Sequence, residues 1–341
     1  MKIGILSLTK NYTKYSYFTE ITYLRYLKKE LRKIGDPIVL TNKNLNEHDP
    51  CQFDCFFLTS YQINFYGGKP NEQSIRKWNF ITECPTPIFQ LFCDFQLPLV
   101  NFPELLKKTF NIDLNKLDSE NFYLIHYCQD LSFIDWLKSK KFAFPLLKKN
   151  CYYFPISDFH YKYQDILQPI KRPQKDICYV GNFRHNSRTK ILKKVGEYLE
   201  NKNLYIYGTR WKDKKINFSN EIILNDPILE YDFSKVINKF FGQIVTYDNI
   251  GIKYKVDSTR LIDTIVSGSL PIIDKKLEYL DIPNFARKLL FENKKDLNRI
   301  LKISNKERNS IIKKYQKYLK EKYSRFDFVS LVKEICEKTN I

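Results

Sequence analysis

Several features are missing from this sequence of 341 residues. No apolar run approaches the roughly 20 residues that a membrane-spanning helix needs. The opening residues, MKIGILSL, are too short and become polar too soon for a signal peptide. Internal repeats and low-complexity tails are also missing, which excludes repeat architectures. We therefore expect a soluble protein that acts in the cytoplasm.

The eight cysteines lack the spacing of a metal site. They form no CxxC pair, and His126 with Cys128 would need two further ligands that nothing nearby supplies. This argues against a zinc-binding module. We expect reduced, mostly buried thiols, as is usual in the cytoplasm.

What the chain does contain is apolar residues and positive charge. Hydrophobic residues make up 43% of a chain long enough for two domains, which indicates a globular protein. The formal net charge of +19 favours a polyanionic partner, whether nucleic acid, an acidic membrane surface or a phosphorylated substrate. A lysine-rich, glycine-poor composition can also simply reflect an AT-rich genome.

Short apolar runs alternate with amphipathic stretches, the pattern of a parallel sheet flanked by helices. One series lies before a proline-containing segment, residues 155–174, which we interpret as a linker, and a second series follows it. We predict an α/β protein with two Rossmann-like domains facing across a central cleft. The expected domains are residues 1–160, residues 170–322, and a C-terminal helix in 323–341 that packs back on the first domain. The expected strands are 2–7, 55–60, 88–93, 123–127, 177–180, 204–207, 243–247 and 270–274, and the expected helices are 19–34, 187–199, 258–267, 306–322 and 326–335.

The segment INFYGGKPN, residues 63–71, combines paired glycines with aromatic and basic neighbours. Gly67 and Gly68 allow close backbone approach and positive φ, while Phe65, Tyr66 and Lys69 supply flat apolar surface and a cation. Such equipment suits a nucleotide or a phosphate. An ordinary tight turn is the alternative.

Two strand-to-helix junctions in the second half are suited to a nucleoside diphosphate. In YVGNFRHNSR, Gly181 permits the turn, and Arg184 and Arg188 lie beside an expected helix N-terminus, where anions bind. In DSTRLID, Arg260 and Asp263 share a face of the next expected helix, so the cation can bind phosphate and the carboxylate can accept ribose hydroxyls. The alternatives are surface arginines and an intrahelical salt bridge.

Two acidic residues are candidates for the chemical step. Asp94, in FCDFQLP, ends an apolar strand, where desolvation favours a raised pKa and a role as general base. An N-cap or a salt-bridged loop residue is the alternative. Glu20 begins the first long helix, where acidic residues are commonplace.

These segments resemble, in order along the chain, the DNA β-glucosyltransferases of T-even bacteriophages. The matching strings are TEITYL, INFYGGKPN, CDFQLP, YYFPI, VGNFRHNSR, LYIYG and STRLIDT. The resemblance is patchy but collinear over almost the whole chain. It implies a two-Rossmann-domain enzyme of the GT-B type that uses UDP-glucose.

The resemblance also implies residue roles. It maps the catalytic aspartate to Asp94 and a glutamate near the sugar to Glu20. The nucleotide-sugar site would comprise Gly181, Asn182, Arg184, Arg188, Tyr207, Gly208, Arg260 and Asp263. DNA would be contacted by Asn64, Phe65, Tyr66, Gly67, Gly68 and Lys69. Two departures stand out: Asp263 replaces a ribose-binding glutamate, and Asn182 replaces a serine.

The activity implied is an inverting transfer of glucose from UDP-glucose to a 5-hydroxymethylpyrimidine, chiefly hydroxymethylcytosine, in double-stranded DNA. Base flipping is expected, together with Mg²⁺ or Mn²⁺ held by the diphosphate, and a monomer in the cytoplasm of an infected host, where the modification would evade restriction. Two alternatives remain open. One is a UDP-sugar glycosyltransferase acting on a saccharide or protein acceptor, and the other is a DNA-binding relative without catalysis.

Overall fold

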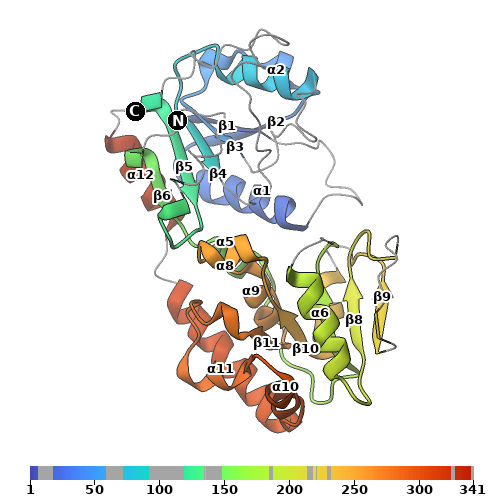
Figure 1. The fold of residues 1–341 in the computed structure, drawn as a ribbon. Coiled ribbons are helices and arrows are strands. Elements are labelled where there is room, and N and C mark those ends of the chain that lie inside the picture. Colours follow the sequence, from blue (N-terminus) through green and yellow to red (C-terminus); the bar gives the residue numbers. More distant parts are fainter. Residues whose placement is uncertain are drawn as a thin grey trace. The chain divides into compact units, whose positions relative to one another are not determined.

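The computed structural model describes residues 1–6, 18–58, 72–91, 119–133, 135, 148–183, 187–212, 218–219, 221–228, 232–323 and 327–338. Contacts divide the chain into two compact units (Figure 1). Unit 1 comprises Met1–Phe159 and Asp327–Ile341, and unit 2 comprises His160–Phe326. Within the described part of the chain, no helix is both long enough and apolar enough to cross a bilayer.

Unit 1 is built on a six-stranded sheet in the order β2-β1-β3-β4-β5-β6, in which all neighbours are parallel. Its strands are β1 (Lys2–Leu6), β2 (Asp36–Leu40), β3 (Cys55–Leu58), β4 (Ile88–Leu91), β5 (Phe122–His126) and β6 (Cys151–Tyr153). Its helices include α1 (Phe18–Leu31), α2 (Glu72–Ile81) and α12 (Phe328–Lys338). The strands β3, β4 and β5 are buried along their whole length and mainly apolar, as expected for a parallel sheet covered on both faces, with Gln90 and His126 as buried polar residues.

The last helix, α12, packs on the core of unit 1 through an aromatic side chain. The ring of Phe328 lies 5.3 Å from that of Phe154, 5.9 Å from Tyr26 and 6.2 Å from Phe57, measured between centroids. Aromatic rings at such separations add stabilisation beyond their burial. The C-terminal segment is therefore a structural part of unit 1.

Unit 2 has a second six-stranded parallel sheet, in the order β12-β11-β10-β7-β8-β9. Its strands are β7 (Lys175–Val180), β8 (Leu204–Tyr207), β9 (Ile222–Asn225), β10 (Phe240–Val245), β11 (Leu270–Asp274) and β12 (Leu290–Phe291). Its helices are α6 (Ser187–Tyr198), α7 (Phe233–Asn238), α8 (Asn249–Lys253), α9 (Thr259–Val266), α10 (Lys294–Leu301) and α11 (Asn305–Tyr323). Counted from β7, the strand order is 3-2-1-4-5-6, which is the Rossmann order, and the order reverses between β7 and β10.

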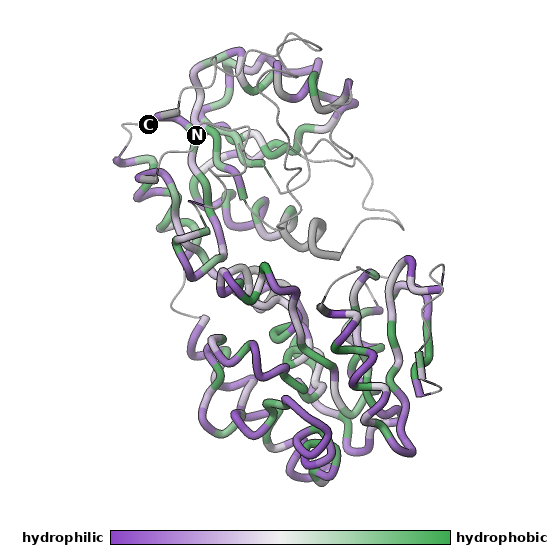
Figure 2. Tube along the Cα trace, viewed as in Figure 1, coloured by the Kyte–Doolittle hydropathy of each residue, from purple (hydrophilic) through white to green (hydrophobic). Residues whose placement is uncertain are grey.

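Burial explains why these segments form these elements. On α9 the residues Leu261, Ile262, Ile265 and Val266 are buried, and the helix packs against β10 and β11. Figure 2 shows hydrophobic colour along the strands of both sheets and hydrophilic colour along α10. The α/β fold predicted from the alternating pattern is confirmed by the two sheets.

The segment 155–174 is not a plain linker. It contains α5 (Ile156–Tyr163), and the boundary between the units lies inside this helix. Of its prolines, Pro155 directly precedes the first turn, where proline is tolerated, and the other two follow the helix. Ser157 and Asp158 are fully buried, and Tyr26 donates a hydrogen bond to Asp158 at 2.8 Å. The boundary between the units thus falls inside the segment interpreted as a linker, but the first half of this segment is helical.

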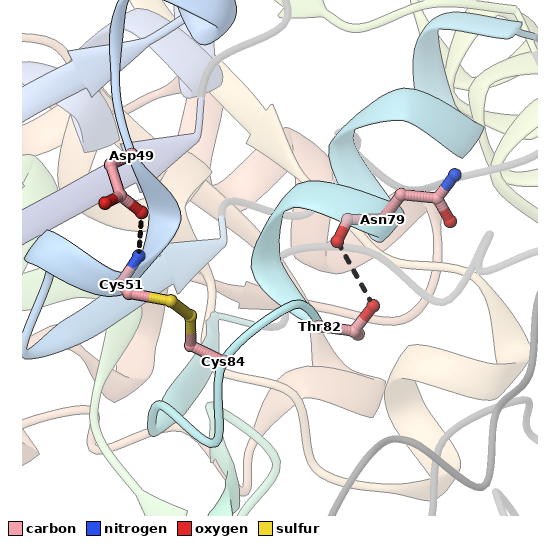
Figure 3. The surroundings of a disulfide bond; sticks show 5 residues. All are labelled: Asp49, Cys51, Asn79, Thr82 and Cys84. Atoms are coloured by element: carbon pink, nitrogen blue, oxygen red, sulfur yellow. Dashed lines mark hydrogen bonds between the residues drawn. A yellow bond between two sulfur atoms is a disulfide. The ribbon is translucent and has the colours of Figure 1, made fainter.

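The expectation of reduced thiols is wrong for one pair of cysteines. Cys51, in the short 3₁₀ turn Pro50–Gln52, forms a disulfide with Cys84, which follows α2, and their Cα atoms are 5.5 Å apart (Figure 3). Asp49 fixes this turn by accepting a hydrogen bond from the Cys51 main-chain N–H at 2.9 Å. Sequence spacing could not show this pair, because the two residues meet only through the packing of β3 and α2. The other described cysteines, Cys55, Cys128, Cys151, Cys178 and Cys336, are not in a disulfide, and Cys93 lies outside the described residues.

Candidate functional site

The candidate site of unit 2 lies at the carboxyl ends of β7, β8 and β10. In open parallel sheets, ligands bind where the strand order reverses, because the loops on either side of that point diverge and leave a crevice. Here the point lies between β7 and β10. The segments that follow β7, β8 and β10 in the sequence carry most of the residues predicted for the nucleotide-sugar site.

Arg260 bridges the two strands at this point. Ser258 caps α9 by accepting a hydrogen bond from the Leu261 main-chain N–H, which sets Arg260 in the first helical turn. The Arg260 guanidinium donates from Nε to the Val180 carbonyl at 3.0 Å and from Nη1 to the Thr246 carbonyl at 2.8 Å. It also stacks over the ring of Tyr179, with Cζ 4.7 Å from the centroid. A guanidinium has five N–H donors, and these two bonds use two of them.

The turns after β7 and β8 are joined through main-chain contacts. Gly181 donates to the Tyr207 carbonyl at 2.9 Å and accepts from Trp211 Nε1 at 2.6 Å. Gly208 has a φ of +154°, and a Cβ there would lie 2.2 Å from the Gly181 oxygen. Only glycine allows this approach. Asn182 Oδ1 accepts from the Thr209 main-chain N–H at 3.0 Å, so its amide group is held in a fixed orientation.

Arg188 is fixed by an ion pair. It lies in the first turn of α6, and its Nη2 is 2.7 Å from Asp248 Oδ2, with both side chains less than one-sixth exposed. Its guanidinium also lies over the ring of Tyr247, with Cζ 5.3 Å from the centroid. Burial by itself lowers the pKa of Arg188, but Tyr179, Asp248 and Tyr247 outweigh burial and raise the pKa above its ordinary value. Arg188 is therefore a permanently charged group with a defined position.

Asp263, one helical turn after Arg260, is buried with 6% of its surface exposed. Gln164 Nε2 donates to Asp263 Oδ1 at 2.5 Å. Arg260 and Asp263 thus have separate partners, main-chain carbonyls for the arginine and a glutamine amide for the aspartate.

The predicted residues of unit 1 fall mostly where the structure gives no description. Asp94 and the segment from Asn64 to Lys69 lie outside the described residues, as does Arg184 of unit 2. For Glu20 only the main chain, within α1, is described. In the sequence, Glu20, the segment from Asn64 to Lys69, and Asp94 follow β1, β3 and β4 in turn, and these are neighbouring parallel strands.

Sequence reasoning missed several residues that shape the site. Asp248 caps α8 by accepting from the Gly251 main-chain N–H at 2.9 Å and also holds Arg188. The position of Asp248 directly after a predicted strand was the available signal. Gln164 and Trp211 carried no such signal, because their partners are distant in sequence. Among the described residues, no three His, Cys, Asp or Glu side chains converge as metal ligands.

Comparisons with known proteins agree with the geometry. No family model matches the chain. The chain is 27% identical over 301 residues to the DNA β-glucosyltransferase of Enterobacteria phage T4, covering 82% of each protein. Its fold is similar to that of the T4 enzyme in complex with UDP and Mn²⁺, with a TM-score of 0.78, 19% identity, and 98% and 99% of the two chains covered. An α-glucosyltransferase in complex with UDP and a 13-mer DNA containing an HMU base is more distant, with a TM-score of 0.59, 11% identity, and 92% and 94% covered. The resemblance to the phage DNA β-glucosyltransferases and the GT-B type of fold, both predicted from the sequence, are therefore confirmed.

Proposed function

We propose that this protein is a UDP-glucose-dependent DNA β-glucosyltransferase. It transfers glucose, with inversion, to the hydroxymethyl group of a 5-hydroxymethylpyrimidine in double-stranded DNA, and hydroxymethylcytosine is the acceptor we favour. The observation that carries this proposal is Arg260 held between Val180 and Thr246 at the switch point of a Rossmann sheet. The sequence similarity to a DNA β-glucosyltransferase over 82% of the chain also supports the proposal.

The donor would bind at the carboxyl edge of unit 2. Arg260 and Arg188 both project from first helical turns, where helix dipoles and guanidinium groups favour anions. They suit a diphosphate, and we assign Arg184 to the same role. The main chain at Gly181 and the amide of Asn182 complete the phosphate side of this site. Tyr207 and Gly208 would line the nucleoside side, where Asp263 would accept hydrogen bonds from the ribose.

The chemical step follows from the acceptor. A hydroxymethyl oxygen is a weak nucleophile, so a base must remove its proton as the oxygen attacks C1 of glucose. We assign this role to Asp94, with Glu20 near the sugar. The new C1–O bond forms as the bond from C1 to the UDP oxygen breaks, and the proton goes to the Asp94 carboxylate. UDP leaves with the bonding electrons, and the arginines stabilise its growing charge.

A divalent cation, Mg²⁺ or Mn²⁺, fits this scheme as a companion of the diphosphate. The described residues offer no cluster of three metal-ligating side chains, and Asp248 already holds Arg188. The diphosphate oxygens, rather than protein side chains, would supply most of the cation's ligands. The cation would neutralise part of the leaving group's charge.

DNA would be bound by unit 1 through the segment from Asn64 to Lys69. A base inside a duplex cannot reach a crevice at a sheet edge, so we propose that the target nucleotide is flipped out. Phe65 and Tyr66 would stack on the base or fill its place. The net charge of +19 supplies sequence-independent attraction to phosphates, so affinity should fall steeply with salt. The proposal locates a monomeric enzyme in the cytoplasm of an infected cell, where it would protect phage DNA from restriction.

The decisive experiment offers labelled UDP-glucose and three duplexes that differ only in one base: hydroxymethylcytosine, hydroxymethyluracil or cytosine. Nucleoside mass spectrometry should detect a hexose on hydroxymethylcytosine and none on cytosine, and NMR of the product should show a β linkage. Asp94→Asn should abolish transfer while leaving UDP affinity within about twofold. Asp36→Asn, at the exposed start of β2, is the control and should be as active as the wild type. No transfer to either modified duplex, or transfer at the wild-type rate by Asp94→Asn, would refute the respective assignment.

A further inference from the structure

We infer that Gln164 is a positioning residue for nucleotide recognition: its side-chain amide orients the Asp263 carboxylate so that it can accept the ribose hydroxyls of UDP. This inference rests on the proposed function and extends it. The contact that carries it is the hydrogen bond from Gln164 Nε2 to Asp263 Oδ1, 2.5 Å long, between residues 99 positions apart in the sequence.

Gln164 is held in place by its own segment. This segment follows α5 and runs along unit 2 as an added main-chain layer. Leu167 donates from its main-chain N–H to the Val266 carbonyl at 2.7 Å, and Gln316 Nε2 donates to the Leu167 carbonyl at 2.9 Å. Further along, the carbonyl of Gln168 accepts from Asn238 and that of Ile170 from Arg308. Gln164 therefore contacts α9 from a main-chain segment that is held in place by hydrogen bonds.

Asp263 needs such a partner because it is short and buried. With 6% of its surface exposed, its carboxylate has lost most of its water and depends on protein donors. An aspartate reaches about 1.5 Å less far than a glutamate, so its orientation decides whether it meets a ribose hydroxyl. The Gln164 amide supplies a donor without cancelling the negative charge. A carboxylate has about four acceptor sites, so it can accept from Gln164 and from a ribose together.

The location of Asp263 agrees with this role. It lies three residues after Arg260 on α9, and residues with this spacing lie on the same side of a helix. Because Arg260 marks the switch point where the diphosphate is proposed to bind, a ribose attached to that diphosphate would lie within reach of the same helix face. Gln164 thus connects the segment after α5 to the part of the site that would distinguish ribose from deoxyribose.

The test compares the dissociation constants of UDP and 2′-deoxy-UDP, measured by calorimetry, for the wild type and two variants of similar volume. Gln164→Met removes the hydrogen-bond donor without adding charge, and Gln164→Glu removes the donor and adds a carboxylate. If only one of the two variants is soluble, that variant alone tests whether Gln164 orients Asp263. For the wild type we expect UDP to bind about tenfold or more tighter than 2′-deoxy-UDP, as a hydrogen bond to a charged acceptor implies. In both variants this ratio should fall to within about twofold of unity.

Gln316→Ala is the matched control. Gln316 donates to the main-chain carbonyls of Leu167 and Ile265, each at 2.9 Å, so it anchors the same segment through groups other than Asp263. This variant should lower the melting temperature and leave the UDP ratio unchanged, which separates orientation of the carboxylate from anchoring of the segment. A wild-type ratio in Gln164→Met or Gln164→Glu would overturn the inference alone. Failure of the wild type to bind UDP would overturn the proposed function and the inference with it.

Discussion

The Arg260 side chain is hydrogen-bonded to the main-chain carbonyl of Val180, the last residue of β7, with Nε and O 3.0 Å apart. Its second bond, to the Thr246 carbonyl, ties β7 to the loop after β10. Lysine keeps the charge but cannot span two carbonyls with a planar fork. Arg260→Lys should therefore lower the free energy of unfolding by about 2 kcal/mol and weaken UDP binding at least about tenfold. Urea denaturation and calorimetry measure the two effects.

Arg299→Lys is the control for this prediction. Arg299, on α10, also donates to main-chain carbonyls, those of Lys288 and Leu290, but it lies near β12 and its side chain is 48% exposed. It should change stability by less than about 1 kcal/mol and leave UDP affinity unchanged. Wild-type affinity in Arg260→Lys would show that this guanidinium only braces the sheet.

The ion pair between Arg188 and Asp248 makes a second prediction. Asp248→Asn keeps a good cap for α8 but removes the negative charge that faces a largely buried arginine. Because the remaining charge is left partly desolvated, the free energy of unfolding should fall by about 2 kcal/mol. Arg188 also loses its fixed orientation, so the Kd for UDP should rise about tenfold. Chemical denaturation and titration of UDP give the two values.

An exposed ion pair in the same unit provides the comparison. Lys275 and Glu292 are 2.7 Å apart, but both side chains are at least half exposed. Glu292→Gln should change stability by no more than about 0.5 kcal/mol, because water screens such pairs. If Asp248→Asn proves as mild as Glu292→Gln, Arg188 does not depend on its partner.

Much of the fold was predictable because its strands are short, continuous apolar runs. β8 and β11 were predicted with their observed bounds, since each is a buried run flanked by turn residues. The edge strand β2 was missed because it contains Pro37, which an edge position tolerates. The helix α5 was missed because prolines near residues 155–174 outweighed its short apolar pattern.

For the candidate site, motifs predicted which residues of unit 2 meet but not what holds them. Arg260 and Gly181 follow from their positions after strands, where topology brings loop residues together. Their partners do not follow, because the Val180 and Thr246 carbonyls are main-chain groups that no residue type reveals. The pairing of Gln164 with Asp263 likewise depends on a path of the chain that no local pattern encodes.

The disulfide between Cys51 and Cys84 makes a third prediction. It closes a loop with a sequence separation of 33, which includes β3 and α2, and a cross-link of that length restricts the unfolded chain. Cys51→Ser should lower the free energy of unfolding by up to about 4 kcal/mol without reductant. With dithiothreitol, the wild type should fall to the level of the variant. Cys151→Ser, which changes a partly buried thiol outside this disulfide, should not alter the response to reductant. A wild type that is equally stable with and without dithiothreitol would show that this bond adds no stability.

His126, at the end of β5, makes the stability of unit 1 sensitive to acid. The side chain is 1% exposed, and burial lowers its pKa from 6.5 to about 4. Between these pH values the unfolded chain binds a proton at this histidine and the folded protein does not. The contribution of neutral His126 to the free energy of unfolding is therefore fully present above pH 6.5 and is lost as the pH falls towards 4. From pH 7.5 to pH 5 this histidine should cost about 2 kcal/mol of unfolding free energy.

Denaturation of His126→Phe at both pH values tests this sensitivity. Phenylalanine fills a similar volume beside the Phe133 ring, whose centroid lies 6.1 Å from that of His126, and it binds no proton. The loss between pH 7.5 and pH 5 should therefore be about 2 kcal/mol smaller in this variant than in the wild type. His48→Gln, which removes a partly exposed histidine of the same unit, should retain the full loss. A buried neutral imidazole takes up a proton on unfolding, and the variant has no imidazole at this position. An identical loss in His126→Phe would therefore mean that other groups cause the acid sensitivity.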